Sequence, residues 1–244
     1  IFTATMITDG VSLISPNAAV VANNVMYFMD KHNFYVYTGV AQVLPCTVRA
    51  FVFDNINETQ GQQVTAFANT GYNEVGWFYP STGSTVCDKM VVYNYLEKAW
   101  SVSELARDAW DDAGASADLP IAVKTSNDAG YVFEHENGYN DDGQALSAFI
   151  ETADFDIADG DSFAFIRRLL PDLSFIGSST SPTLTYSLKS RNNTDGTLTT
   201  QSTVDVSNTT DFSISNVRAR ARQMRVRIES TDEDNGWRLG DVRL

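Results

Sequence analysis

The amino-acid sequence predicts an all-β protein, and three observations support this. Apolar residues come in short runs that are rich in Val, Phe, Tyr and Trp. Asn, Asp, Gly and Ser bound these runs, as is typical of strands that end in turns. Helical periodicity is almost absent, and the single short helix that we expect covers residues 103–110.

The first part of the chain repeats a plan of strand, turn and aromatic strand. The repeats join residues 25–29 to 34–37, residues 90–95 to 100–102, and residues 121–123 to 130–133, with further strands expected at 47–53, 64–68 and 75–79. Small apolar sheets in series are typical of propeller blades, while the irregular spacing also fits a meander or a sandwich. We assign residues 1–145 to an aromatic-rich, β-propeller-like region.

The second part of the chain differs in composition from about residue 146. Its expected strands are rich in Ser and Thr and alternate with apolar residues, at 184–188, 198–206 and 212–214. This pattern favours an antiparallel sandwich or sheet. We assign residues 146–244 to a β-sandwich-like domain.

Length and charge exclude some classes of protein. The chain has 244 residues, of which 43% are apolar, so one large or two small domains can bury a sizeable core. Its 17 basic and 31 acidic residues give a net charge of −14. Autonomous binding of DNA or RNA needs a basic surface, which argues against that function. No apolar run approaches the roughly 20 residues of a membrane-spanning helix, and we expect no membrane association.

Motifs that indicate an enzyme or a cofactor are missing from the sequence. It has no nucleophile-elbow, phosphate-binding or dinucleotide-binding glycine motif, and its histidines and cysteines lack the spacing of zinc ligands. Cys46 and Cys87 are expected to be buried thiols, with a disulfide as the alternative. We expect no enzymatic activity and no cofactor. If the protein were an enzyme, the strongest candidates for paired catalytic carboxylates would be the acidic residues around Gly138. They are Glu134, Glu136, Asp141 and Asp142.

The last segment of the chain carries a ladder of arginines. Residues 217–244 hold 7 basic residues, all arginine, against 5 acidic ones, while residues 1–216 hold 10 basic and 26 acidic ones. Apolar and basic residues alternate here, and the apolar parity changes near Gln223, which indicates a bulge or a passage between packing layers. Intramolecular ion pairs, a subunit interface and phosphate contacts are the three alternatives, and the interface is our hypothesis. The candidate interface residues are Arg218, Arg220, Arg222, Arg225 and Arg227.

A cluster of aspartates precedes this ladder in the sequence. The cluster does not have the spacing of an EF-hand loop, and a solvated or capped turn is the simpler interpretation. A bound cation is the alternative. Its candidate ligands are Asp154, Asp156, Asp159 and Asp161.

Several longer strings resemble the tail nozzle or tail-hub proteins of short-tailed bacteriophages, a group that stabilises packaged DNA. They occur in order over most of the chain, roughly residues 25–244. They are LPCTVR at 44–49, NEVGWFYP at 73–80, VVYNY at 91–95, RDAW at 107–110, RRLLPD at 167–172, RARQM at 220–224 and GWRLGD at 236–241.

The resemblance implies a non-enzymatic component of the virion tail. Such proteins attach beneath the portal and adaptor, assemble as a ring that is typically a hexamer, and line the channel that retains and then conducts DNA. The resemblance implies a propeller in residues 1–145 and a platform with the ring contacts in residues 146–244. A complete propeller does not fit this length, so a partial one is implied. An acidic wall suits a conduit because it repels DNA and does not bind it specifically.

Two other functions remain as alternatives. A tail protein that binds or cleaves host carbohydrate is one, because the 10 Tyr and 4 Trp residues can stack on sugars. An extracellular bacterial adhesion module is the other.

Overall fold

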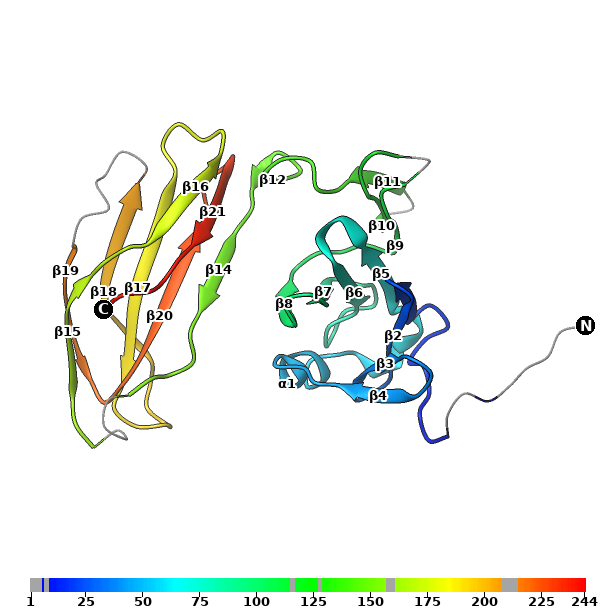
Figure 1. Cartoon of the computed structure of the whole chain (residues 1–244), viewed down its shortest axis with the longest axis horizontal. Helices are drawn as coiled ribbons and strands as arrows, with labels where there is room; N and C mark the ends of the chain where they lie inside the picture. The colour runs from blue at the N-terminus through cyan, green and yellow to red at the C-terminus, as the bar shows by residue number, and fades with distance from the viewer. Residues whose placement is uncertain (1–5, 7–8, 115–116, 127–128, 157–160, 208–214) are drawn as a thin grey trace, which may run out of the picture. The chain divides into compact units, whose positions relative to one another are not determined.

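The structure is a computed structural model in which residues 6, 9–114, 117–126, 129–156, 161–207 and 215–244 are described. It confirms the all-β fold, and the described strands pair antiparallel (Figure 1). The chain divides into two compact units, Ile1–Asn137 and Gly138–Leu244, ahead of the boundary expected near residue 145. Among the described residues, no helix has the length and apolar character to cross a membrane.

The first unit consists of three successive meander sheets, β1-β2-β3-β4, β5-β6-β7-β8 and β9-β10-β11. The three predicted hairpins are confirmed as β2–β3, β7–β8 and β10–β11. A two-residue turn, Asn23-Asn24, joins β1 to β2. Both residues have positive φ, a conformation that asparagine adopts more readily than most residues other than glycine. The bounds are β1 Ala19–Ala22, β2 Val25–Met29, β3 Phe34–Tyr37, β4 Ala41–Leu44, α1 Arg49–Phe53, η1 Glu58–Gln63, β5 Thr65–Asn69, η2 Thr70–Tyr72, β6 Glu74–Tyr79, β7 Lys89–Asn94, β8 Ala99–Ser103, β9 Ala109–Asp111, β10 Ile121–Ser126 and β11 Ala129–Glu134.

Neighbouring sheets of the first unit meet near their first strands. Ala66 on β5 donates its backbone N–H to Asn17 O at 2.7 Å, and Trp77 Nε1 donates to Ala18 O at 3.0 Å. Trp110 Nε1, on β9, donates to Ala68 O on β5 at 2.8 Å. The indoles of Trp77, which is buried, and Trp110, which is partly exposed, therefore link one sheet to the next through their N–H groups.

Two local predictions are wrong. Residues 47–53 were expected as a strand, but Arg49–Phe53 form α1, because one helical turn lets the adjacent Val52 and Phe53 both pack on the core. Residues 103–110 were expected as a helix, but residue 103 ends β8, residues 104–108 are the connection, and residues 109–110 begin β9. There Arg107 is buried, with its Cζ 4.1 Å from the Phe133 ring centroid, so tertiary contacts override local helix propensity.

The second unit packs several antiparallel sheets around one core. Its main sheet has the order β14-β20-β17-β18, and three ribbons, β12–β13, β15–β19 and β16–β21, accompany it. The predicted strands at 184–188 and 198–206 are confirmed within β17 and β18, while 212–214 lies outside the described residues. The bounds are β12 Asn140–Asp141, β13 Gln144–Ala145, β14 Ala148–Glu151, β15 Ala164–Leu169, β16 Leu173–Gly177, β17 Thr183–Arg191, β18 Thr199–Ser207, β19 Ser215–Ala221, β20 Gln223–Ser230 and β21 Asn235–Leu239.

The core of the second unit lies between the main sheet and the ribbon β15–β19. Large side chains of the main sheet, such as Leu184, Tyr186 and Ile228, are almost fully buried. They belong to one cluster with the small side chains of the ribbon, such as Ala219 and Ala221. Small residues let the ribbon approach the sheet closely, while its alternate residues face outward.

Candidate subunit interface on the second unit

The arginine ladder changes packing layers at Arg222. Strand β19 ends at Ala221 and pairs with β15, whereas β20 begins at Gln223 and pairs with β14 and β17. The change of apolar parity therefore reflects a passage from the ribbon to the main sheet, the second of the two predicted explanations. The buried residues are Val217, Ala219 and Ala221 on β19, then Met224, Val226 and Ile228 on β20.

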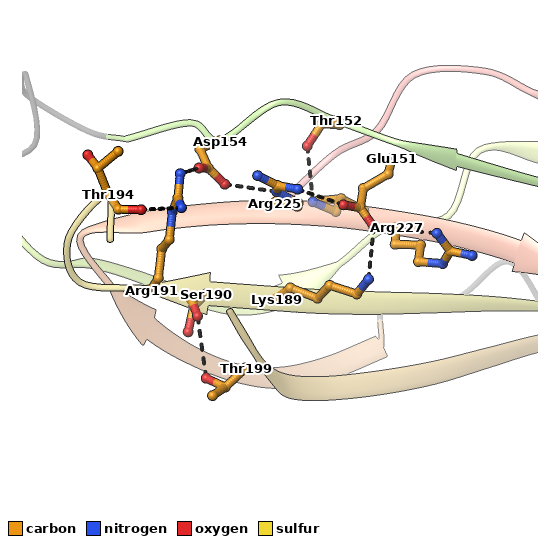
Figure 2. Close-up of polar contacts among 11 residues, drawn as sticks. Glu151, Thr152, Asp154, Lys189, Ser190, Arg191, Thr194, Thr199, Arg225 and Arg227 are labelled. Carbon is orange, nitrogen blue, oxygen red and sulfur yellow. Dashed lines mark hydrogen bonds and ion pairs between the residues drawn. The ribbon is translucent and has the colours of Figure 1, made fainter. Parts of the chain in front are cut away.

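Arg225 is the centre of an ion-pair cluster on the main sheet (Figure 2). Its Nε donates to Asp154 Oδ1 and its Nη1 donates to Glu151 Oε1, both at 2.8 Å. After β14 ends, the chain continues alongside β20, since the Thr152 and Phe155 N–H groups donate to the Val226 and Met224 carbonyls. This backbone pairing holds the two carboxylates over the guanidinium.

Three further cations complete the same cluster. Lys189 Nζ lies 2.8 Å from Glu151 Oε2, and Arg191 pairs with Asp154. Arg227 Nη1 lies 3.5 Å from Glu151 Oε2, and its guanidinium carbon lies 3.8 Å from the centroid of the Phe149 ring. We call Glu151, Asp154, Lys189, Arg191, Arg225 and Arg227 the ion-pair cluster.

The ion-pair cluster shifts the pKa values of its members. Burial alone would raise the pKa of Glu151, but hydrogen bonds from Lys189 and Arg225 together overcome it and lower that pKa. The hydrogen bond from Arg225, followed by that from Arg191, holds the pKa of Asp154 below its usual value. Hydrogen bonds from Asp154 and Glu151 raise the pKa of Arg225. For Arg225 and Arg227, the structure therefore shows the intramolecular ion pairs that were one of the three alternatives.

Of the other three arginines, Arg218 and Arg220 lie on the outer face of the ribbon β15–β19, and Arg222 directly follows β19. The guanidinium carbons of Arg220 and Arg222 lie 4.7 Å and 5.4 Å from the centroid of Phe163, a side chain that is 46% exposed. Phe165, which is 43% exposed, is the cross-strand partner of Arg220. No ion pair joins Arg218, Arg220 or Arg222 to a carboxylate among the described residues.

A register shift between Ile166 and Arg168 adds two more cations to this surface. It leaves Arg167 and Arg168 both exposed, and Arg167 lies 5.1 Å from the Phe165 ring centroid. We name this surface the Arg–Phe face, and it comprises Phe163, Phe165, Arg167, Arg168, Arg218, Arg220 and Arg222. Sequence reasoning missed the two phenylalanines, although Phe163 and Phe165 alternate with Ala164 and Ile166 as an exposed strand face would.

Three of the four aspartates of the candidate cation site lie in the described part of the chain. Asp154 is a member of the ion-pair cluster, while Asp156 and Asp161 are exposed. Asp159 lies outside the described residues. Within the described ranges, no group of three or more His, Cys, Asp or Glu side chains has a metal-binding arrangement.

The candidate catalytic carboxylates have separate structural partners. Glu134 accepts from Asn137 Nδ2 at 3.1 Å, and Glu136 accepts from Asn69 Nδ2 at 2.7 Å. Asp141 and Asp142 belong to the second unit. The two thiols are free, and burial raises the pKa of Cys46 to about 11 and that of Cys87 to about 12. Both thiols are therefore protonated and weakly nucleophilic at neutral pH.

Most of the tryptophans that were considered for sugar stacking are packing residues. Trp77 is fully buried, and Trp100 and Trp110 donate their indole N–H groups to the Pro45 and Ala68 carbonyls. Trp237 packs on the core of the second unit. Trp77 is therefore closed to a sugar ring, while the other three indoles are partly exposed.

No protein-family model matches this chain, and no curated protein is a significant match to it. The functional assignment therefore depends on the residues and on the geometry of the two units.

Proposed function

We propose that this chain is a structural subunit of a short-tailed bacteriophage tail, of the nozzle or hub class, that assembles as a ring beneath the portal and adaptor and lines the DNA channel. The observation that carries the proposal is the Arg–Phe face. Arginine and aromatic residues are the types most enriched at the centres of protein interfaces. Here five arginines and two phenylalanines gather on the outer face of the ribbon β15–β19 and on the residues that directly flank it.

The fold of the first unit supports a partial propeller. Its sheets are meanders in chain order, and hydrogen bonds join neighbouring sheets near their first strands. In a propeller the first strand of each blade lies nearest the central channel, and sequential blades pack face to face. The aromatic residues between the sheets, with Phe34 and Trp77 at 4.8 Å between ring centroids, supply such a packing surface.

The charge distribution supports a channel role. The first unit holds 15 acidic and 6 basic residues, a net charge of −9, and the second holds 16 and 11, a net charge of −5. Several copies around one axis multiply this negative field, which repels the DNA phosphates and lets a duplex slide without being held.

The test is the native mass of the protein, measured alone and mixed with the portal and adaptor complex of its virion. We expect a closed ring, with six copies as the number that the resemblance implies, formed either in solution or only on the portal. A chain that stays monomeric in both samples contradicts the proposal. A DNA-conducting ring should also show no retention of duplex DNA at physiological salt.

A further inference from the structure

The main sheet of the second unit carries an acidic cleft. Asp205, Thr185 and Glu229 are cross-strand neighbours on β18, β17 and β20. The cleft has a volume of about 290 Å³, and we name it the acidic cleft. Its lining comprises Thr183, Thr185, Asp205, Glu229, Thr231 and Asp232.

Two carboxylates of the acidic cleft have no cation beside them. Asp205 Oδ1 accepts from Thr185 Oγ1 at 2.8 Å, and Asp232 Oδ2 accepts from the Thr183 N–H at 2.6 Å. Neither forms an ion pair within the described part of the chain. Glu229 pairs with Arg227 at 2.8 Å. Because both donors are uncharged, no positive charge among these partners compensates the negative charges of Asp205 and Asp232.

The acidic cleft and the Arg–Phe face lie on opposite sides of the same core. Thr185 and Glu229 alternate with Leu184, Tyr186 and Ile228, which point into the core. The arginines of β19 likewise alternate with residues that enter this core from the ribbon. One outward side of the unit therefore carries the Arg–Phe face, and the other carries the acidic cleft at one end of the main sheet and the ion-pair cluster beside it.

This placement selects one mode of association between copies. An isologous contact would bring the Arg–Phe face against itself and oppose like charges, which costs several kcal/mol. A heterologous contact matches cations with carboxylates at every step around a ring. Guanidinium forks can bind carboxylates in a bidentate way, and the phenylalanines supply the apolar part of the contact.

We propose that the Arg–Phe face of one copy docks on the acidic cleft of a second copy, head to tail. This inference rests on the proposed function, because it names the surfaces through which the ring closes. A nucleic-acid partner for the same face has less support, because the chain carries a net charge of −14.

The first experiment uses two variants that each damage one surface. The face variant is Arg220→Glu/Arg222→Glu, and the cleft variant is Asp205→Asn/Asp232→Asn, in which the amides keep an oxygen for the Thr185 and Thr183 donors. Each should raise the concentration needed for half-assembly by at least about tenfold. Lys31→Glu/Lys98→Glu is the matched control, since both lysines are exposed in turns of the first unit, and it should assemble as the wild type does.

The second experiment mixes the two variants in equal amounts. The cleft variant still has an intact Arg–Phe face and the face variant still has an intact acidic cleft, so the mixture should form dimers with one copy of each and go no further. Native mass measurement detects these dimers. Near-identical circular dichroism of both variants and the wild type checks that the folds are intact.

The outcomes separate this inference from the proposed function. If both variants form rings as the wild type does, or if the mixture yields no mixed dimers, the assignment of the two docking surfaces is wrong. The proposal that the protein forms a ring is unaffected by either result. If rings form only on the portal, the same variants are compared there. Retention of duplex DNA that the face variant loses, with assembly unchanged, assigns the face to DNA and overturns the inference. A wild type that is monomeric with and without the portal overturns both proposals.

Discussion

The two halves of the arginine ladder are neighbours in sequence and have different environments in the structure. On β20, Arg225 contacts two carboxylates and its side chain is 26% exposed. On β19, Arg220 contacts the ring of Phe163 and no carboxylate among the described residues. The difference arises from what lies across the sheet, since β14 and the segment after it bring Glu151 and Asp154 to the main sheet, where β20 lies, and not to the ribbon β15–β19. A row of like residues therefore forms ion pairs within the chain at one end and lies exposed beside aromatic rings at the other.

The largest expected effect on folding comes from removing the centre of the ion-pair cluster. Arg225→Ala removes the guanidinium that two partly buried carboxylates share, and should lower the free energy of unfolding by about 2 kcal/mol, between the costs for exposed and buried pairs. Arg220→Ala should change it by less than about 0.5 kcal/mol, because that side chain is exposed. Amide hydrogen exchange on β14 and β20, followed by mass spectrometry, measures the change in unfolding free energy in each of the two variants. Equal losses in the two variants would remove the distinction between the halves.

Acid should weaken the β20 half of the ladder selectively. Both carboxyl groups of the cluster have lowered pKa values in the folded chain, so their stabilisation is complete above the ordinary values of 4.5 for Glu151 and 3.8 for Asp154. It is lost as the pH falls through the lowered folded values. The urea midpoint of the second unit, followed from about pH 6 to about pH 3, should drop in the wild type and drop less in Arg225→Ala. Parallel curves for the two proteins would contradict this assignment.

Salt should weaken the β19 half more than the β20 half. Exposed charges are screened over about 8 Å at physiological salt, while partly buried pairs are screened less. An increase from about 50 mM to about 500 mM sodium chloride should raise the half-assembly concentration by about tenfold and shift the urea midpoint of the second unit only slightly. Native mass and unfolding curves on the same samples give the comparison. Assembly that is indifferent to salt would argue for a largely apolar contact elsewhere.

The smallest expected effect concerns the aromatic part of the Arg–Phe face. Phe163→Ser removes the ring under Arg220 and Arg222, and should weaken assembly by about two- to fivefold, the value of an exposed cation–π contact. Phe51→Ser is the control, because Phe51 is 53% exposed on α1 in the first unit. Native mass titrations quantify both variants. A control that weakens assembly as much would place the contact on the first unit instead.

Local patterns in the sequence predicted the all-β class, many of the individual strands, the three hairpins and the faces of the arginine ladder. Val217, Ala219 and Ala221 alternate with arginine, and the period of two in a strand places them on the buried side without reference to the rest of the chain. The change of parity near Gln223 likewise indicated a bulge or a change of layer. These predictions needed only neighbours in the sequence.

Only the tertiary structure decided what each face contacts. The pairing of Arg225 with Asp154 joins residues far apart in the chain, and so does the cross-strand pairing of Phe165 with Arg220. The same reason explains the errors at residues 47–53 and 103–110, where Phe53 and Arg107 follow their packing partners rather than local propensity. Sequence alone determined which side of a strand is buried, because strand geometry is local. The partner of the exposed side was decided by sheet order and layer contacts, because these join distant segments.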